Sequence, residues 1–84
     1  MRYKAVFVKS FVREFKRLPD DVKERILEGV RKVSGNPYEG IRLRGRFKGL
    51  WRFRIGKYRL IYIIDEKNKR VVFVDVGLRK AIYK

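Results

Sequence analysis

The sequence predicts an α+β fold in which an N-terminal helical hairpin packs on one face of a mainly antiparallel, four-stranded sheet. One observation is that apolar residues recur at helical spacing between residues 10 and 35. Another is that three strand-like segments follow, the first two joined by the tight turn Gly56-Lys57. With 84 residues, 45% of them hydrophobic, the chain can bury one modest core, so we expect a single domain over residues 1–84.

The N-terminal part predicts one strand followed by a short helix. Residues 2–9 alternate sufficiently between apolar and polar side chains to form a first strand. Ser10 is the expected N-cap of an amphipathic helix, because its hydroxyl can accept a hydrogen bond from a free backbone N–H. Pro19 is expected to end that helix, because proline lacks the N–H that a helix interior needs.

A second helix is predicted to end at Gly35. Asp21 and Glu24 have the spacing of a capping box, in which two side chains satisfy free backbone donors at the start of a helix. Apolar residues then continue at helical spacing as far as Gly35, and glycine commonly ends helices. The segment 36–49 contains proline and several glycines, so we expect it to be irregular.

Strands are expected over residues 50–55, 58–65 and 70–76, the last of them apolar on both faces and therefore central. If Gly56-Lys57 is a two-residue hairpin loop, Arg54 lies directly opposite Arg59. Because side chains alternate between faces, the hairpin then has an apolar face covered by the helices and a cationic face on the open side. The apolar set is Trp51, Phe53, Ile55, Tyr58, Leu60 and Tyr62, and the cationic set is Arg52, Arg54 and Arg59.

Net charge is the strongest global signal in the sequence. The chain has 24 Lys and Arg residues against 9 Asp and Glu residues, which gives a formal net charge of +15. No acidic residue occurs between Gly40 and Ile64, where many of the cations are concentrated. Such a distribution favours an anionic partner, either nucleic acid or an acidic protein, over a basic surface that is merely solvated.

Composition excludes several kinds of site. The sequence has no histidine and no cysteine, which excludes imidazole acid–base pairs, disulfides and thiolate zinc sites. The carboxylates on predicted strands, Asp65 and Asp75, belong to different strands, so we expect no metal site and no cofactor. No segment approaches the roughly 18–20 apolar residues that cross a bilayer, and residues 1–10 do not resemble a signal peptide. We therefore expect a cytoplasmic protein without membrane contact.

The functional groups that remain are those of arginine, lysine and tyrosine, and they suit metal-free cleavage of RNA. In this reaction the 2′-hydroxyl group attacks the adjacent phosphate, so the enzyme supplies no nucleophile. Guanidinium groups can bind the phosphate bidentately and stabilise the charge that develops in the transition state. Cations outside the central hairpin face are expected to bind RNA phosphates, namely Arg42, Arg44, Arg46, Lys48 and Lys57.

Three segments carry a resemblance to a known family. They are LRG at residues 43–45, LWRFRIGKYRLIY at 50–62 and VGLRKAIY at 76–83. Together they resemble the RelE/ParE superfamily of prokaryotic toxin–antitoxin toxins, and the similarity extends over essentially the whole chain. The resemblance implies a RelE-like fold with a small sheet and a helix pair. It also implies metal-free cleavage of messenger RNA in the ribosomal A site, leaving a cyclic phosphate.

The resemblance further implies roles for individual residues. By position, Arg59 would hold the phosphate, Arg79 would stabilise or protonate the leaving group, and Tyr83 would stack on a base or move a proton. Arg52 and Arg54 match a basic pair that is lysine in RelE itself. Because arginine is a poor general base, Tyr83 is the best candidate for that role.

The resemblance implies partners as well, and it leaves other functions open. The expected partners are a cognate RelB-like antitoxin, the ribosome and mRNA. One alternative is a ParE-like toxin that inhibits DNA gyrase without cutting RNA. Another is a catalytically impaired relative that only binds nucleic acid. The presence of both Arg79 and Tyr83 favours the ribonuclease, because ParE-like relatives usually lack that pair.

Overall fold

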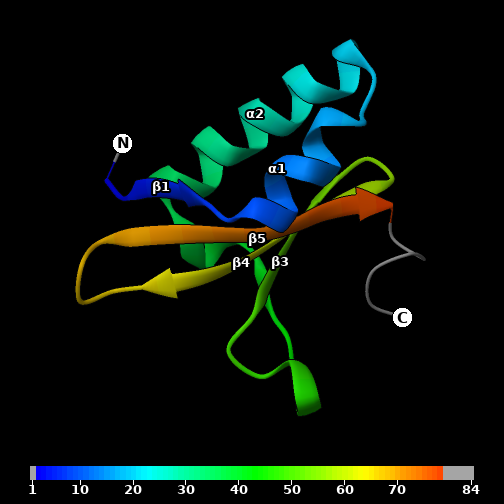
Figure 1. Ribbon diagram of the computed structural model, residues 1–84. Helices are drawn as coiled ribbons and strands as arrows, with labels where there is room; N and C mark the ends of the chain where they lie inside the picture. The colour runs from blue at the N-terminus through cyan, green and yellow to red at the C-terminus, as the bar shows by residue number, and fades with distance from the viewer. Residues whose placement is uncertain (1, 79–84) are drawn as a thin grey trace.

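The computed structural model describes residues 2–78 and shows a five-stranded sheet with two α-helices packed on one face (Figure 1). The elements are β1 (Lys4–Phe7), α1 (Lys9–Lys16), α2 (Asp20–Gly35), the short 3-10 helix η1 (Pro37–Glu39), β2 (Ile41–Arg42), a second 3-10 helix η2 (Gly45–Phe47), β3 (Trp51–Ile55), β4 (Tyr58–Asp65) and β5 (Arg70–Leu78). The α+β fold with a helical hairpin on a mainly antiparallel sheet is therefore confirmed.

The strands lie in the order β1-β5-β4-β3-β2, with β1 parallel to β5 and every other pair antiparallel. The four strands that the sequence predicts are β1, β3, β4 and β5. The fifth strand, β2, is only two residues long and lies in the segment expected to be irregular. Such a short strand has no alternating pattern of its own, and it forms because Ile41 and Arg42 pair with β3. β5 has neighbours on both sides, as its apolar sequence predicts.

Both predicted helix caps are wrong. Ser10 lies inside α1, and its hydroxyl donates a hydrogen bond to the carbonyl of Val74 at 3.0 Å, which attaches the helix to β5. α2 begins at Asp20, directly after Pro19, so the Asp21 side chain is within the first turn and no side chain caps the helix. Pro19 has a φ of −61° in extended backbone and is the N-cap residue of α2. Proline is tolerated at the start of a helix because the backbone N–H that it lacks would have no partner within the helix there.

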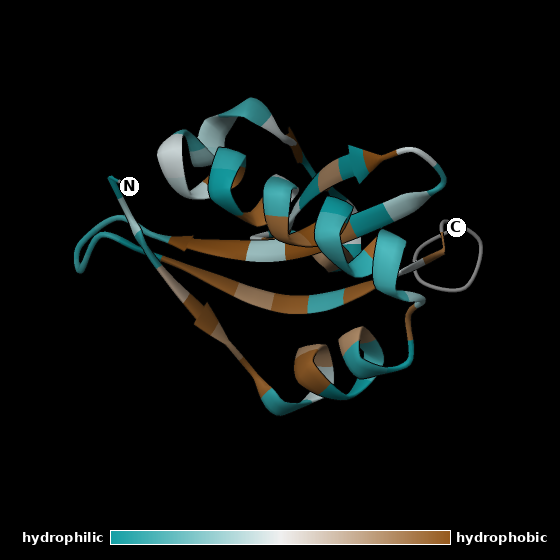
Figure 2. Cartoon of the chain, turned by 90° about the horizontal axis from the view of Figure 1, so that it is seen from above, coloured by the Kyte–Doolittle hydropathy of each residue, from teal (hydrophilic) through white to brown (hydrophobic). Residues whose placement is uncertain are grey.

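The core lies between the helices and the sheet. Figure 2 shows α2 with hydrophilic residues along its outer side and hydrophobic residues toward the strands. The most buried side chains come from both layers: Phe11, Ile26, Val30, Val33, Leu60, Tyr62, Val71, Phe73 and Val76. Neither helix in the described part of the chain is long and apolar enough to span a bilayer.

The β3–β4 hairpin has the predicted register. Ile55 pairs with Tyr58, and Arg54 pairs with Arg59, across the Gly56-Lys57 turn. Gly56 has a φ of 60°, a conformation that glycine adopts without steric cost. The apolar face of the hairpin packs on the core as expected, with Leu60 and Tyr62 fully buried.

Tyr62 attaches the irregular segment to the sheet. Its hydroxyl donates a hydrogen bond to the carbonyl of Pro37 at 2.7 Å, and burial raises the pKa of Tyr62 to about 12. Gly40 passes so close that a Cβ atom there would lie 2.2 Å from the Tyr62 hydroxyl oxygen and 2.7 Å from the Arg52 carbonyl oxygen. These contacts hold η1 in place and bring β2 against β3.

A carboxylate forms a second connection near the β4–β5 turn. Glu66 accepts hydrogen bonds from the hydroxyl groups of Tyr3 and Tyr38, each at 2.7 Å, and from the Lys69 ammonium. These three donors, with Lys69 the strongest, lower the pKa of Glu66 to about 2. The start of the chain, η1 and the turn are thereby joined at one side chain.

We predict that the contacts of Tyr62 and Gly40 stabilise the fold. Tyr62→Phe leaves the Pro37 carbonyl without its donor, and Gly40→Ala forces two backbones apart, so each should lower the free energy of unfolding by about 1–3 kcal/mol. Gly35→Ala is the matched control, because a Cβ atom there would have nothing within 4 Å. Urea unfolding followed by circular dichroism measures all three, and equal stability of Gly40→Ala and Gly35→Ala would contradict the assignment.

We predict that Glu66 makes stability depend on pH in the acidic range. Because the pKa is lower in the folded state, this contribution is fully present above the unfolded pKa of about 4.3 and is lost as the pH falls toward 2. The stability difference between wild type and Glu66→Gln should therefore shrink between about pH 5 and pH 2. Glu24→Gln on the exposed side of α2 serves as control. A difference that stays constant over this range would refute the prediction.

Candidate functional site

The face of the sheet opposite the core carries the predicted arginines in two rows. Arg52 on β3 pairs with Ile61 on β4, which pairs with Asp75 on β5. In the next row Arg54 pairs with Arg59, which pairs with Gly77. We call this set the arginine face: Arg52, Arg54, Arg59, Ile61, Asp75 and Gly77. It combines three guanidinium groups with one carboxylate.

The arginine face is not uniformly open, which corrects the expectation from the sequence. Arg54 is exposed and Arg52 is partly buried, but Arg59 is only 4% exposed and Ile61 is fully buried. Arg59 is buried in part because β4 has a strand on each side, and its cross-strand partners are Arg54 on β3 and Gly77 on β5. Shielding from water strengthens the interaction of a guanidinium group with any anion that reaches it.

The predicted pairing of like charges is present. Arg54 and Arg59 are directly opposite each other, an arrangement that costs roughly 0.2–1 kcal/mol relative to a neutral pair. The Arg54 side chain donates from Nε to the carbonyl of Gly56 at 3.3 Å, which directs it toward the hairpin turn. Two cations at one register position form a suitable site for a phosphate group, which can accept hydrogen bonds from both.

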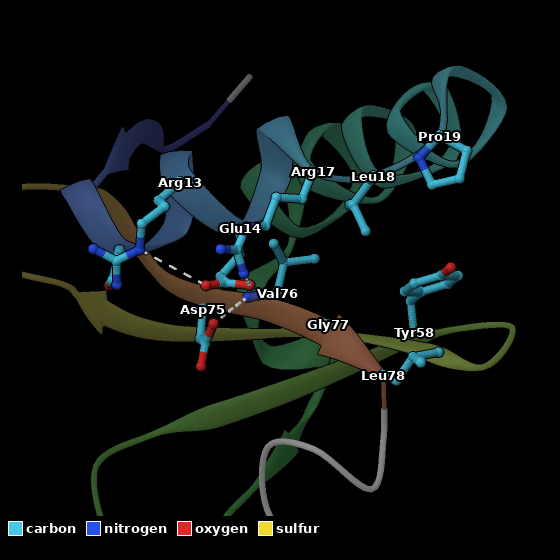
Figure 3. Close-up of a pocket in the computed structure, with 11 residues that line it drawn as sticks. Arg13, Glu14, Arg17, Leu18, Pro19, Tyr58, Asp75, Val76, Gly77 and Leu78 are labelled. Atoms are coloured by element: carbon cyan, nitrogen blue, oxygen red, sulfur yellow. Dashed lines mark hydrogen bonds and ion pairs between the residues drawn. The ribbon is translucent and has the colours of Figure 1, made fainter.

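Asp75 is a feature of this face that the sequence interpretation treated only as a metal ligand. The ladder between β4 and β5 shifts register next to Ile61, and this irregularity directs Asp75 away from the core while Val76 faces it. Figure 3 shows the Asp75 and Val76 side chains on opposite sides of β5. Burial raises the pKa of Asp75, against an opposing hydrogen bond from the Val76 backbone N–H at 2.9 Å. A bulge depends on pairing between strands, so no local sequence signal reveals it.

A cavity of about 500 Å³ lies beside Asp75, between α1 and the end of β5 (Figure 3). Its charged lining from the α1 region consists of two arginines and the one glutamate that lies near both. Glu14 lies 3.8 Å from the Arg13 side chain and 3.9 Å from that of Arg17. The negative charge of Glu14 further raises the pKa of Asp75. The cavity therefore places Glu14 and its two arginine neighbours at the edge of the arginine face.

The other predicted RNA-binding cations do not lie on the arginine face. Arg42 pairs with Trp51, so it lies on the opposite side of the sheet from Arg52 and Arg54. Arg42, Arg44 and Lys48 are exposed and line a separate cleft with Trp51. Two further cations are also exposed: Arg46, whose guanidinium carbon is 5.3 Å from the centre of the Phe47 ring, and Lys57, in the hairpin turn.

Two of the predicted catalytic residues, Arg79 and Tyr83, lie outside the described residues. They follow β5, whose last residue is Leu78. Within residues 2–78, no group of three or more acidic side chains is arranged to hold a metal ion.

Comparison with known proteins places the chain in a family. Residues 5–83 match the family described as ParE toxin of type II toxin-antitoxin system, parDE. A curated relative, Toxin RelE of Mycobacterium tuberculosis, is 31% identical over 84 residues, which cover 98% of this chain and 87% of the relative.

Solved structures share the fold. The toxin-antitoxin complex RelBE2 from Mycobacterium tuberculosis contains a chain that is 30% identical, with a TM-score of 0.88 over 94% of this chain and 100% of that chain. The archaeal RelE-RelB complex from Pyrococcus horikoshii contains one that is 29% identical, with a TM-score of 0.78 over 94% of this chain and 97% of that chain. The chain thus belongs to the RelE/ParE superfamily and is a RelE-family toxin of a type II toxin–antitoxin system.

Proposed function

We propose that this toxin is a metal-independent, ribosome-dependent endoribonuclease that cleaves mRNA in the cytoplasm and so inhibits translation. The observation that supports it best is the Arg54–Arg59 pair, at directly opposed positions on adjacent strands, with Arg59 almost fully shielded from water. An RNA phosphodiester, which carries one negative charge, can accept hydrogen bonds from both guanidinium groups. The chain has no histidine, so the charge stabilisation is assigned to arginine.

In the proposed reaction the 2′-oxygen of one nucleotide bonds to phosphorus as the bond to the 5′-oxygen of the next nucleotide breaks. Arg59 and Arg54 bind the non-bridging oxygens, on which negative charge grows in the transition state. Arg52, two residues before Arg54 on β3, binds a neighbouring phosphate and orients the RNA strand. The products are a cyclic phosphate and a free 5′-hydroxyl.

Two protons must move in this reaction, and the residues after β5 are assigned to them. Tyr83 takes the proton from the 2′-hydroxyl, which requires neighbouring cations to lower the pKa of its phenol. Arg79 stabilises the leaving 5′-oxygen or supplies its proton. These roles follow from the positions of Arg79 and Tyr83 in the VGLRKAIY segment.

We also propose a cognate antitoxin as partner. The two structural relatives above were solved as RelBE2 and RelE-RelB complexes. A net charge of +15 favours an acidic or amphipathic RelB-like polypeptide as the ligand of the free toxin.

A second candidate function is inhibition of DNA gyrase. One specific observation favours it, namely that the matching family is described by the ParE toxin. The two functions differ in their product. A translation extract given the purified toxin should yield fragmented mRNA if the ribonuclease proposal holds. Intact mRNA together with inhibited supercoiling by purified gyrase would instead support the ParE-like function.

We predict that Arg54→Ala separates activity from folding. Arg54 is exposed and faces Arg59, so its removal should leave the free energy of unfolding unchanged or raise it by up to about 1 kcal/mol. Cleavage of ribosome-bound mRNA should nevertheless fall by about 10²–10³, as when a donor that stabilises transition-state charge is lost. Lys67→Ala, an exposed cation in the β4–β5 turn, is the control and should cleave normally.

Arg59→Lys completes that experiment. Because Arg59 is buried, an alanine there would disturb packing as well as chemistry, whereas lysine keeps the positive charge. A folded Arg59→Lys protein with wild-type cleavage, or a wild-type rate for Arg54→Ala, would remove the arginine face from the mechanism.

We predict that Tyr83→Phe distinguishes proton transfer from stacking. Phenylalanine keeps the ring and removes only the hydroxyl. If Tyr83 moves a proton, the cleavage rate should fall by roughly 10²-fold or more. If its ring only stacks on a base, the variant should cleave almost like wild type, and the general base must then be sought elsewhere. Single-turnover cleavage on programmed ribosomes measures the difference.

A further inference from the structure

We propose that the toxin has a second RNA site, on the opposite side of the sheet from the arginine face, in the cleft around Trp51. The cleft would bind a single-stranded segment of RNA that is not cut, with Arg42, Arg44 and Lys48 on its phosphates and Trp51 against a base. This inference deepens the proposed ribonuclease function and rests on it for the identity of the ligand as RNA.

The position of the cleft follows from the pairing of β2 with β3. Arg42 is opposite Trp51, so both share the face of the sheet on which Tyr62 is buried. Ile41 also lines the cleft, and it pairs with Arg52 of the other face, so the cleft includes the edge of the sheet at β2. The cleft has a volume of about 770 Å³ and continues along the loop after β2. Figure 1 shows this loop, with η2, projecting away from the rest of the molecule, where a large partner can reach it.

Charge predicts an anionic ligand for the cleft. Arg42, Arg44 and Lys48 are all exposed, and no acidic residue is present among the lining residues. Among the described residues, the ion pairs of the molecule lie elsewhere, on α1, α2 and the β4–β5 turn. Three neighbouring cations in a cleft lined by no acidic residue among those described repel one another, and a chain of phosphates is a ligand whose spacing can satisfy several of them.

The aromatic side chain in the cleft favours RNA over an acidic peptide. Trp51 is partly buried and held from two directions, by stacking on Tyr62 at 6.5 Å between ring centres and by edge contact with Tyr38 at 5.4 Å. The Arg42 guanidinium lies 6.0 Å from the centre of the Trp51 ring. A fixed aromatic ring beside exposed cations is the arrangement by which proteins bind single-stranded nucleic acid, since every base offers a face for stacking.

The two sites would have different tasks. The arginine face acts on the phosphate at which the RNA strand is cleaved. The cleft would only hold RNA, either another part of the message or ribosomal RNA. Loss of cations in the cleft should therefore weaken binding and leave the cleavage step of bound RNA unchanged. Loss of Arg54 should have the opposite signature.

Trp51 is the only tryptophan of the chain, so its fluorescence reports on the cleft directly. The probe is a 2′-O-methyl RNA oligonucleotide of about ten nucleotides, long enough to contact several phosphates and blocked against attack by its own 2′-oxygen. We expect it to quench the emission of Trp51. Each of Arg44→Ala and Lys48→Ala should reduce the slope of log affinity against log salt by about 0.7, the value for one phosphate contact on a single strand.

Matched variants separate the cleft from general electrostatics. Lys67→Ala should bind the oligonucleotide with the wild-type slope, and Arg54→Ala should keep the quenching amplitude because it lies on the other face. Trp51→Leu, followed by the anisotropy of a labelled oligonucleotide, should bind at least about tenfold more weakly. Circular dichroism confirms that each variant is folded.

The proposal is overturned if the oligonucleotide leaves the emission of Trp51 unchanged, or if Arg44→Ala and Lys48→Ala keep the wild-type slope. It is also overturned if a polyglutamate peptide quenches as strongly at the same charge, since the cleft would then be a site for an acidic protein segment. These results are independent of cleavage. Fragmented mRNA without quenching refutes the cleft alone, and quenching without fragmented mRNA refutes the ribonuclease alone.

Discussion

The alternation of side chains along β4 determines which residues of the central strands lie on the arginine face and which lie in the core. Leu60 and Tyr62 are fully buried against the helices, so Arg59 and Ile61 must point to the other face. A slip of one residue would place a guanidinium group in the apolar core and expose two large hydrophobic side chains. The register of β4 is therefore fixed by the hydrophobic effect, and the register of β3 and β5 against it sets the two rows of the arginine face.

Tyr62 extends this constraint from the core to the periphery. Its ring stacks on Trp51, and its hydroxyl holds the Pro37 carbonyl, so one buried side chain supports both the aromatic wall of the cleft and the segment that leads into β2. β2 is only two residues long and has little stability of its own. It is positioned because the chain passes Tyr62 at Gly40, where only a residue without a Cβ atom fits. The packing of Tyr62 in the core therefore helps to position the residues of the proposed RNA cleft.

Local sequence patterns predicted the hairpin well. They failed for features that depend on contacts between residues far apart in the sequence. The Arg54–Arg59 pairing could be predicted, because a two-residue turn and strict alternation leave one register. The burial of Arg59 could not be predicted, because it depends on how other parts of the fold pack around β4 and not on the local pattern. The sequence also did not predict that the cations are divided between two faces, because the side on which Arg42 lies is set by its pairing with Trp51. Ser10 was assigned to a cap, and its hydroxyl instead bonds to Val74, 64 residues away.

The stability of the fold and the proposed activity are linked through the same pair of arginines. In the free toxin Arg54 and Arg59 oppose each other across two strands, and this repulsion is part of the native state only, because the unfolded chain separates them. A phosphate bound between them is attracted to both guanidinium groups. A ligand that binds the native state and not the unfolded one must stabilise the fold in proportion to its occupancy. On the proposed function, the substrate and the hairpin that binds it therefore stabilise each other.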